Sequence, residues 1–539
     1  MPLIETIKPN KFHSFFMFPF QFDERYDLEK LIKIINEKNS NWGYDELDIK
    51  EGIHYNEYFY FYPHLRNILF SKKNKKFDNN MKRAFFRAQK ITAKKLNYTV
   101  ILNDDTEYSL PLEQIYLHLF ENKTGILVFE IMQLVPKYNL QQYLKFLDMG
   151  RRIYIPYIKA GKDIPTEINK NGMELQEVLQ AVKDLQCPKK IIIDENQKLE
   201  HDFVNDFNFD KNKPEISVMN NIIIQLLDSD NFKFDKEDYK STIDDRMYSH
   251  TYFEITDNKE INGNDLFLKQ TKEYFDKDCQ TIDVVKESLK VWYQMIFVDS
   301  SKEPLCNNTQ MLKELLEKAT YKRWTGSGSL FGFSRYSSVV VSNWDVIRHH
   351  FESMYYQIAL LNLFYRNSLL LFSDRAIQIS ENIKKRWAMS DLQNLQEDII
   401  LFENKYWFRE ISAQEQGIEM FDMWEKQFRN NLLLNDVKQG IKELYTYFDL
   451  QREKKNSNKL KILTIVAGLF FPITIAIDII VMDYNDQSFI WYFMKKNNLI
   501  NYGLGISIFG FFIMALYLLK EPALEIKEKI EHLLGKWKK

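Results

Sequence analysis

Two adjacent arginines, Arg151 and Arg152, follow Gly150 where a helical pattern gives way to an extended one. A guanidinium keeps its positive charge and offers several donors, so two of them at the junction of two elements suit phosphate binding. A solvated pair of surface charges is the more ordinary interpretation. A phosphate contact is the functional hypothesis that the pair raises beside it.

An indole and a third guanidinium lie around a glycine-containing segment near the middle of the chain. Trp324 and Arg335 belong to the segment 324–344, which reads as a hairpin because glycines precede a β-branched run. Both side chains could stack on a nucleobase, although core packing and a surface ion pair are the more ordinary explanations. The Gly-Ser-Gly-Ser sequence is not followed by Gly-Lys-Ser/Thr, so we interpret it as a turn and not as a phosphate loop.

Metal and catalytic motifs are not evident in the sequence. The cysteines Cys187, Cys279 and Cys306 are far apart, which excludes zinc-type spacing and a disulfide framework. His349 and His350 are adjacent, so on a helix they could not both face one metal ion. No nucleophile–base pair or nucleotide fingerprint was found, and an enzyme is therefore the least expected class.

Two apolar segments near the carboxyl terminus predict a membrane hairpin. Residues 460–482 carry two charges in 23 residues, and residues 501–519 carry none in 19. Each segment is long enough to cross a hydrocarbon core of about 30 Å. Lysines flank the pair on both sides, which predicts cytoplasmic termini in an inner membrane and an outer loop at 483–500.

A carboxylate inside the first apolar segment raises the possibility of a pore. Asp478 would have to face water or a bundle interior. The positions at helical spacing before it, with the next acidic residue after it, form the pore-lining set that we expect: Leu460, Leu463, Ala467, Phe471, Thr474, Asp478 and Asp483. A ring of such carboxylates would attract cations, and an apolar constriction could close the pore. The alternative is that Asp478 is hydrated near the outer surface.

Length and composition limit the classes of protein that can contain these residues. The chain has 539 residues with 73 Lys and Arg against 75 Asp and Glu. This balance argues against direct binding of nucleic acid. The mean hydropathy of −0.40 excludes a transporter built mostly from spanning helices but allows one or two spans.

Proline usage divides the chain into two parts. Eleven of the 13 prolines lie at or before Pro304, and the next one is Pro472. A stretch without breakers permits long helices. We therefore expect an α+β cytosolic domain followed by long helices and a two-helix transmembrane hairpin. The predicted divisions are 1–304 (α+β domain), 305–344 (hairpin and linker), 345–459 (long helices with a stalk), 460–482 (first span), 483–500 (outer loop), 501–519 (second span) and 520–539 (basic tail).

Local patterns predict individual elements within these divisions. Strands are expected at 13–22, 152–158 and 291–298, and a hairpin around residues 122–125. The apolar segment 354–372 contains Gln357, Asn362 and Arg366, which favour a buried helix over a membrane span. A helix is expected from 412 to 459, where Leu434, Val437 and Ile441 recur at the spacing of a helix packing seam.

The segment 463–474 (LTIVAGLFFPIT) closely resembles the first span of the CorA divalent-cation transporter family. The resemblance implies a homo-oligomeric ring, pentameric in that family, with a stalk helix that enters the membrane and Mg²⁺ or another cation as the permeant ion. The family's Gly-Met-Asn signature is replaced here by Val481, Met482 and Asp483. Only the methionine is retained, so the degenerate signature predicts altered selectivity in a pore that still attracts cations.

Three further strings resemble CorA-like membrane effectors of prokaryotic antiviral defence, including those associated with type III CRISPR systems. They are 18–20 (FPF), 330–336 (LFGFSRY) and 350–356 (HFESMYY). This resemblance implies a cytosolic domain that senses a nucleotide second messenger, such as an adenylated S-adenosylmethionine, and compromises the membrane. Arg151, Arg152, Trp324 and Arg335 are then the candidate ligand contacts.

Three functions remain open from the sequence. The first is a ligand-gated membrane channel or effector, the second a divalent-cation transporter with a degenerate signature, and the third a membrane-anchored scaffold without transport. The expected partners are the lipid bilayer, other copies of the chain and a small nucleotide ligand.

Overall fold

A computed structural model describes the chain over separated ranges. These are residues 2–22, 28, 42–44, 51–70, 85–90, 95–153, 187–194, 199–203, 222, 226, 239–243, 245–256, 262–276, 287–385, 387–482 and 509. The chain forms two compact units. The first comprises Met1–Leu371 and Phe402–Leu433, and the second comprises Phe372–Leu401 and Leu434–Lys539.

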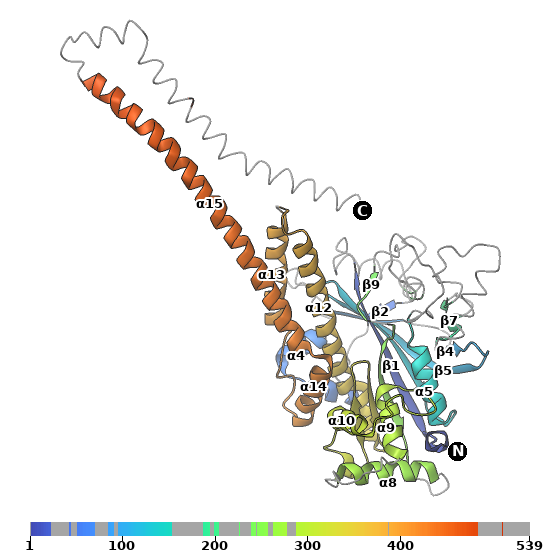
Figure 1. The fold of residues 1–539 in the computed structure, drawn as a ribbon. Helices are drawn as coiled ribbons and strands as arrows, with labels where there is room; N and C mark the ends of the chain where they lie inside the picture. Colours follow the sequence, from blue (N-terminus) through green and yellow to red (C-terminus); the bar gives the residue numbers. More distant parts are fainter. Residues whose placement is uncertain are drawn as a thin grey trace. The chain divides into compact units, whose positions relative to one another are not determined.

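The first unit contains a mixed β-sheet with 13 strands among the described residues (Figure 1). The strands are β1 Lys11–Phe22, β2 Trp42–Tyr44, β3 Phe85–Lys90, β4 Leu96–Ile101, β5 Glu107–Phe120, β6 Thr124–Gln133, β7 Lys190–Asp194, β8 Leu199–Asp202, β9 Tyr239–Ser241, β10 Tyr248–Glu254, β11 Thr320–Tyr321, β12 Leu330–Phe333 and β13 Ser337–Val341. The main order is β11-β12-β13-β10-β1-β6-β5-β4-β7-β8. The pairing of β10 with β13 is parallel, and the other pairings given for the described strands are antiparallel.

The central strand of this sheet is β1, close to the amino terminus. On one side it pairs with β6, and on the other side it pairs first with β10 and then with β9. The pairing with β10 ends at Met17, and the pairing with β9 begins at Phe20. Pro19 lies in the gap between these two partners, a position where a residue without an N–H group is tolerated.

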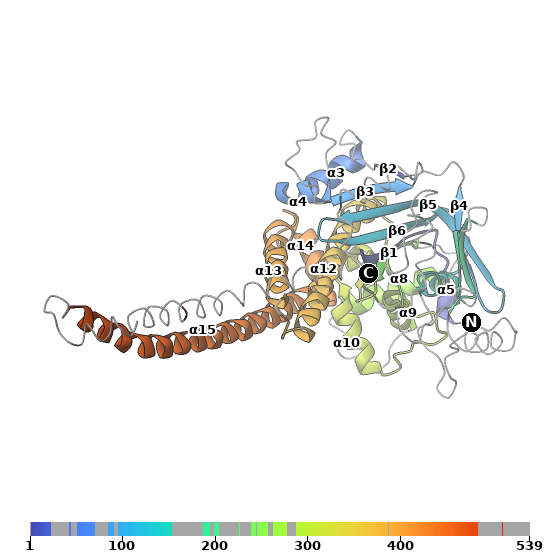
Figure 2. The ribbon, with the colours of Figure 1, turned by 90° about the horizontal axis from the view of Figure 1, so that it is seen from above.

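Helices cover both faces of the sheet. In the first unit they are α1 Leu3–Thr6, α3 Gly52–Tyr60, α4 Pro63–Leu69, α5 Leu140–Gly150, α8 Asn262–Asp276, α9 Glu287–Phe297, α10 Thr309–Ala319, α11 Asp345–His350, α14 Glu415–Phe428 and most of α12 Tyr356–Glu381. Phe12 of β1 stacks on Tyr143 of α5, whereas Phe15 packs against Tyr356 of α12. The two helices accordingly lie on opposite sides of β1 in both views (Figures 1 and 2). Burial of both faces explains why β1 reads as an almost continuous apolar run.

The second unit consists of long helices in its described part. It holds the end of α12, most of α13 Ala388–Lys405 and most of α15 Asn430–Met482. Leu434, Val437 and Ile441 are buried, at the spacing that predicted a helix packing seam. Arg375 of α12 and Asp398 of α13 form an ion pair of 2.6 Å within this unit.

Several local predictions are confirmed. The strand predicted at 13–22 is part of β1, and the hairpin predicted around residues 122–125 connects β5 to β6. The segment 354–372 is helical and largely buried, as its internal Gln357, Asn362 and Arg366 indicated.

Two local predictions are wrong. The strand expected at 291–298 is part of helix α9, because a helix that is apolar all round carries the same aromatic and β-branched residues as a buried strand. The single helix expected from 412 to 459 is divided into α14 and α15 at Arg429, whose backbone is left-handed with φ 58°. Neither glycine nor proline marks this break in the sequence.

The predicted transmembrane hairpin is also wrong. Residues 460–482 continue α15, a helix of 53 residues that begins at Asn430 and carries many charges along its first half. Within the ranges that the structure describes, no helix combines the length and the apolar character needed to cross a membrane. The hydropathy of 23 residues considered alone produced the prediction, and the pore assignment depended on it. Both are withdrawn, together with the membrane-protein and ion-channel classes.

Other predictions lie outside the described residues. They concern the outer loop 483–500 with Asp483, the second apolar segment 501–519 apart from Phe509, the tail 520–539, and the strand expected at 152–158 beyond Ile153.

Candidate functional site

The end of α5 is fixed tightly against the sheet, and this places the two arginines predicted to bind phosphate. Asn139 caps the start of the helix through a reciprocal pair of hydrogen bonds with Gln142. At the other end, the Tyr98 hydroxyl donates to the Gly150 carbonyl at 2.7 Å. A β-carbon on Gly150 would lie 3.2 Å from Phe16, so only glycine fits this contact comfortably.

Arg152 is neutralised by two buried carboxylates. Its Nη2 donates to Asp148 at 3.2 Å, and its Nη1 donates to Asp245. Asp148 also accepts from the Ser300 hydroxyl at 2.8 Å. The side chain of Arg152 is only 3 % exposed. This arginine therefore joins α5 to the segment before β10, and the structure gives it a partner for its charge inside the fold.

Arg151 is in a different situation. It is fully buried, and its Nη1 donates to the Tyr336 carbonyl at 3.0 Å. Its Nε and Nη2 have no hydrogen-bond partner in the part of the chain that the structure describes. Burial lowers the pKa of Arg151 to about 9; the nearby Asp148 opposes this shift, whereas Arg246 and Arg152 add to it. Among the described residues, two donors of this buried cation thus lack acceptors, and the Nε of Arg152 lacks one as well.

Two more guanidinium groups lie near Tyr336. Arg366 of α12 donates to the Phe428 carbonyl at 2.8 Å, and burial together with the charge of Arg335 lowers its pKa to about 10. No carboxylate within the described ranges forms an ion pair with Arg151, Arg335 or Arg366. We call these three residues the guanidinium site.

Aromatic side chains line the same neighbourhood. The buried Tyr248 lies close enough to Arg151 for that charge to oppose the rise in its pKa that burial causes. Its hydroxyl accepts a hydrogen bond from Trp424 Nε1 at 2.7 Å, and its ring packs on Phe428. Tyr336 is 44 % exposed and Arg335 is exposed. The hairpin turn that contains these two residues therefore lies between the buried Arg151 and the surface. Chemically, the arrangement can accept an oxyanion beside aromatic rings.

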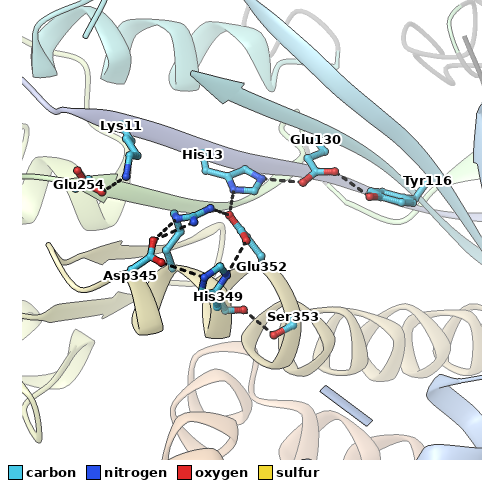
Figure 3. Close-up of polar contacts among 10 residues, drawn as sticks. Lys11, His13, Tyr116, Glu130, Glu254, Asp345, His349, Glu352 and Ser353 are labelled. Atoms are coloured by element: carbon cyan, nitrogen blue, oxygen red, sulfur yellow. Dashed lines mark hydrogen bonds and ion pairs between the residues drawn. The ribbon is translucent and has the colours of Figure 1, made fainter. Parts of the chain in front are cut away.

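A second group of charge surrounds the buried His13 near the start of β1, and each of its cations lies beside a carboxylate (Figure 3). His13 Nε2 hydrogen-bonds to Glu130 of β6 at 2.9 Å, and His13 Nδ1 lies 3.3 Å from Glu352. Tyr116 of β5 donates to the other oxygen of Glu130 at 2.8 Å. Arg348 Nη1 donates to Glu352 at 2.7 Å. We call His13, Glu130, Glu352 and Arg348 the histidine network.

The charges of the histidine network stabilise one another. Burial alone would lower the pKa of His13, but the contacts with Glu130 and Glu352 outweigh it and raise the pKa to about 9. Burial would raise the pKa of Glu352, and the charges of His13 and Arg348 instead hold it below its usual value. Since His13 keeps its proton at neutral pH, it is a poor candidate for a general base.

A π-helical turn positions Glu352. Residues Phe351–Tyr355 form this turn between α11 and α12, without interrupting the helix. Arg348 and His349 of α11 both contact Asp345, and His349 Nδ1 lies 3.7 Å from Glu352 (Figure 3). We did not predict this site from the sequence. The charges at spacings of three and four between Asp345 and Glu352 were the available signal.

The remaining predicted site residues are not brought to the guanidinium site. Trp324 precedes the short 3₁₀ turn Thr325–Ser327, at the opposite end of β12 from Arg335, and its Nε1 is buried without a hydrogen-bond partner among the described residues. The former pore-lining residues Leu460, Leu463, Ala467, Phe471 and Thr474 are exposed along α15. Asp478, Val481 and Met482 belong to the same helix.

Metal binding gains no support from the geometry of the described residues, since none of their His, Cys, Asp and Glu side chains gather in a group of three or more that could hold an ion. Comparison with family models, curated proteins and solved structures found no match to the chain.

Proposed function

We propose that the first unit is a ligand sensor that binds a phosphorylated small molecule of the nucleotide class at the guanidinium site. The observation that carries this proposal is the buried Arg151, whose Nε and Nη2 have no acceptor among the described residues. A bound phosphate oxygen would supply the missing acceptor and offset the cost of burying the cation.

Three features of the site favour a phosphate over a carboxylate ligand. Arg151, Arg335 and Arg366 supply positive charge that forms no ion pair with a described carboxylate, which suits a ligand with more than one negative oxygen. Arg335 is exposed at the turn between β12 and β13, where a ligand can approach. The half-exposed ring of Tyr336 is available for stacking on a base.

The resemblance to effectors of antiviral defence supports the nucleotide class, because those proteins are thought to respond to a nucleotide second messenger. Of the four residues expected to contact such a ligand, the proposal retains Arg151 and Arg335. It replaces Arg152, which is paired with Asp148 and Asp245, by Arg366. The proposal concerns ligand binding alone and assigns no transport activity.

Isothermal titration calorimetry on the full chain tests the proposal. Inorganic phosphate, AMP and adenylated S-adenosylmethionine would be compared as ligands. We expect Arg151→Met and Arg366→Met each to weaken binding by about 10- to 100-fold, because each removes a charge-assisted contact. Arg335→Ala should weaken it less, since an exposed contact is worth less.

Arg323→Ala is the matched control for these substitutions. Arg323 is also an arginine of the first unit, but it is paired with Glu419 at the surface. Unchanged binding by this variant, with loss in Arg151→Met, supports the proposal. Equal affinity of the wild type and Arg151→Met for every ligand would refute it.

A further inference from the structure

The π turn between α11 and α12 is a conformationally unusual element with a specific anchor. Turns with i→i+5 hydrogen bonding are rare, and single ones within α-helices often accompany function. Here the turn spans Phe351–Tyr355. Two consecutive residues within it, Phe351 and Glu352, contact side chains of the sheet.

The two consecutive residues make different kinds of contact. Phe351 is fully buried and stacks on His250 of β10, with ring centroids 4.2 Å apart. Glu352 lies 3.3 Å from His13 Nδ1 and accepts from Arg348 (Figure 3). The ionic contact of Glu352 is therefore adjacent in sequence to the aromatic contact of Phe351. Loss of the ionic contact would free Glu352, the neighbour of Phe351.

Relaxation of the turn to an ordinary α-helix would displace the short preceding helix. α12 is held to the sheet by Asn367, which donates to the carbonyls of Phe20 and Gly125. α11 has only six residues, and Val346 within it is 60 % exposed. A change from π-helical to α-helical hydrogen bonding rotates the two flanking helices relative to each other. Since α12 is the more firmly attached of the two, α11 is the helix that would move.

A contiguous set of packed side chains connects the turn with the guanidinium site. The His250 ring that stacks on Phe351 also packs against Trp424, with centroids 5.8 Å apart. Trp424 in turn donates a hydrogen bond to Tyr248, which lies beside Arg151. Displacement of Phe351 would therefore disturb the ring that positions Trp424 and, through it, the aromatic wall of the site.

We propose that the contact between His13 and Glu352 is a latch that holds the π turn on the sheet and that the latched state favours ligand binding at the guanidinium site. The second half of this statement rests on the proposed function. The first half does not, because the latch can be observed without a ligand.

Hydrogen–deuterium exchange of the full chain, read at residues 351–357, tests the latch. We expect His13→Gln and Glu352→Gln to speed exchange there by about tenfold, since each removes a hydrogen-bonded charge from the anchor. Lys11→Gln is the matched control: Lys11 lies on β1 like His13, and the substitution removes its ion pair with Glu254 of β10 but leaves His13 intact. Unchanged exchange in both latch variants would overturn the latch, even if one of them were destabilised as a whole.

Titration of the same variants with AMP and adenylated S-adenosylmethionine tests the coupling. We expect the two latch variants to bind at least about fivefold more weakly than Lys11→Gln and wild type, in the range of ordinary allosteric coupling. Faster exchange with unchanged affinity would overturn the coupling and keep the latch. Absence of binding by the wild type would refute the proposed function and the coupling, while the exchange result would still decide the latch.

Discussion

The first unit contains two groups of charge, each around one buried cation, that differ in how the charge is compensated. In the histidine network each cation meets a carboxylate: His13 contacts Glu130 and Glu352, and Arg348 contacts Glu352. In the guanidinium site the buried Arg151 and the half-buried Arg366 donate to carbonyl oxygens, those of Tyr336 and Phe428. A network that satisfies its own charges stabilises one conformation, whereas one that leaves donors free is suited to an external anion.

Arg151 and Arg152 reproduce this difference within two consecutive residues. Both are buried, yet only Arg152 has carboxylate partners. Sequence spacing treats the two as one basic pair. The two guanidinium groups differ because their partners are distant in sequence. Asp245, which pairs with Arg152, and Tyr336, which accepts from Arg151, come about 90 and 185 residues later.

The largest expected effect on stability comes from substituting these two arginines separately. Arg152→Met should destabilise the protein by about 3–5 kcal/mol, because Asp148 and Asp245 would remain buried without their main cation. Arg151→Met should change the free energy of unfolding by less than about 1 kcal/mol, since burying an uncompensated charge already has a cost. Urea unfolding of both variants measures the difference, and equal destabilisation would show that the two arginines have the same structural role.

A smaller loss is expected from the histidine network. His13→Gln should cost about 2 kcal/mol near pH 6, because Glu130 and Glu352 keep Tyr116 and Arg348 as partners. The folded-state pKa of about 9 exceeds the usual 6.5, so the contribution of His13 is complete below pH 6.5 and is lost as the pH rises through 9. Urea midpoints of the variant and wild type should therefore converge between these values. A constant gap would contradict a charged His13.

His250 should give the opposite pH dependence. Burial, followed by the charge of His13, lowers its pKa to about 3. A histidine kept neutral in the fold stabilises above pH 6.5, and the contribution is lost as the pH falls toward 3. His250→Asn should thus remove part of the acid destabilisation seen in wild type and have little pH dependence at neutral pH. Thermal unfolding from pH 7 to 4 measures this, and identical acid slopes would exclude a buried neutral His250.

The smallest effect is expected where the histidine network reaches the surface. Asp345 is 66 % exposed while it contacts Arg348 and His349. Asp345→Asn should therefore cost less than about 1 kcal/mol and lose its effect at high salt. Denaturant titrations at low and high salt test this, and a larger cost that resists salt would place Asp345 within the buried network.

Local sequence patterns predicted where helices and strands lie, but they did not predict which charged side chains pair with one another. The β5–β6 hairpin, β1 and the helix around residues 354–372 follow from turn residues, apolar runs and length. The break at Arg429 could not be predicted, because nothing in that residue type favours φ 58° and tertiary contacts impose it. The membrane hairpin was predicted from hydropathy alone, and that quantity does not take account of the helix in which the segment lies.

The candidate site was predicted only in part, because some of its residues carry a local signal in the sequence and others do not. Arg151 and Arg335 were singled out as cations at element junctions, which is a local feature. Arg366 was interpreted only as evidence against a membrane span, because its approach to Phe428 depends on how α12 and α14 pack. His13 attracted no attention within an aromatic strand, since both of its carboxylate partners come from other elements.

The central place of β1 has a consequence for synthesis of the chain on the ribosome. Tyr248, at the start of β10, follows the end of β1 by 226 residues. At about 5–20 residues per second, one edge of this aromatic strand stays without β10 for roughly 10–45 seconds after β1 is made. β6 can protect the other edge much earlier. The nascent chain therefore exposes an unpaired edge of β1 while 226 of its 539 residues are made, and we expect its yield to depend on chaperones that bind aromatic segments.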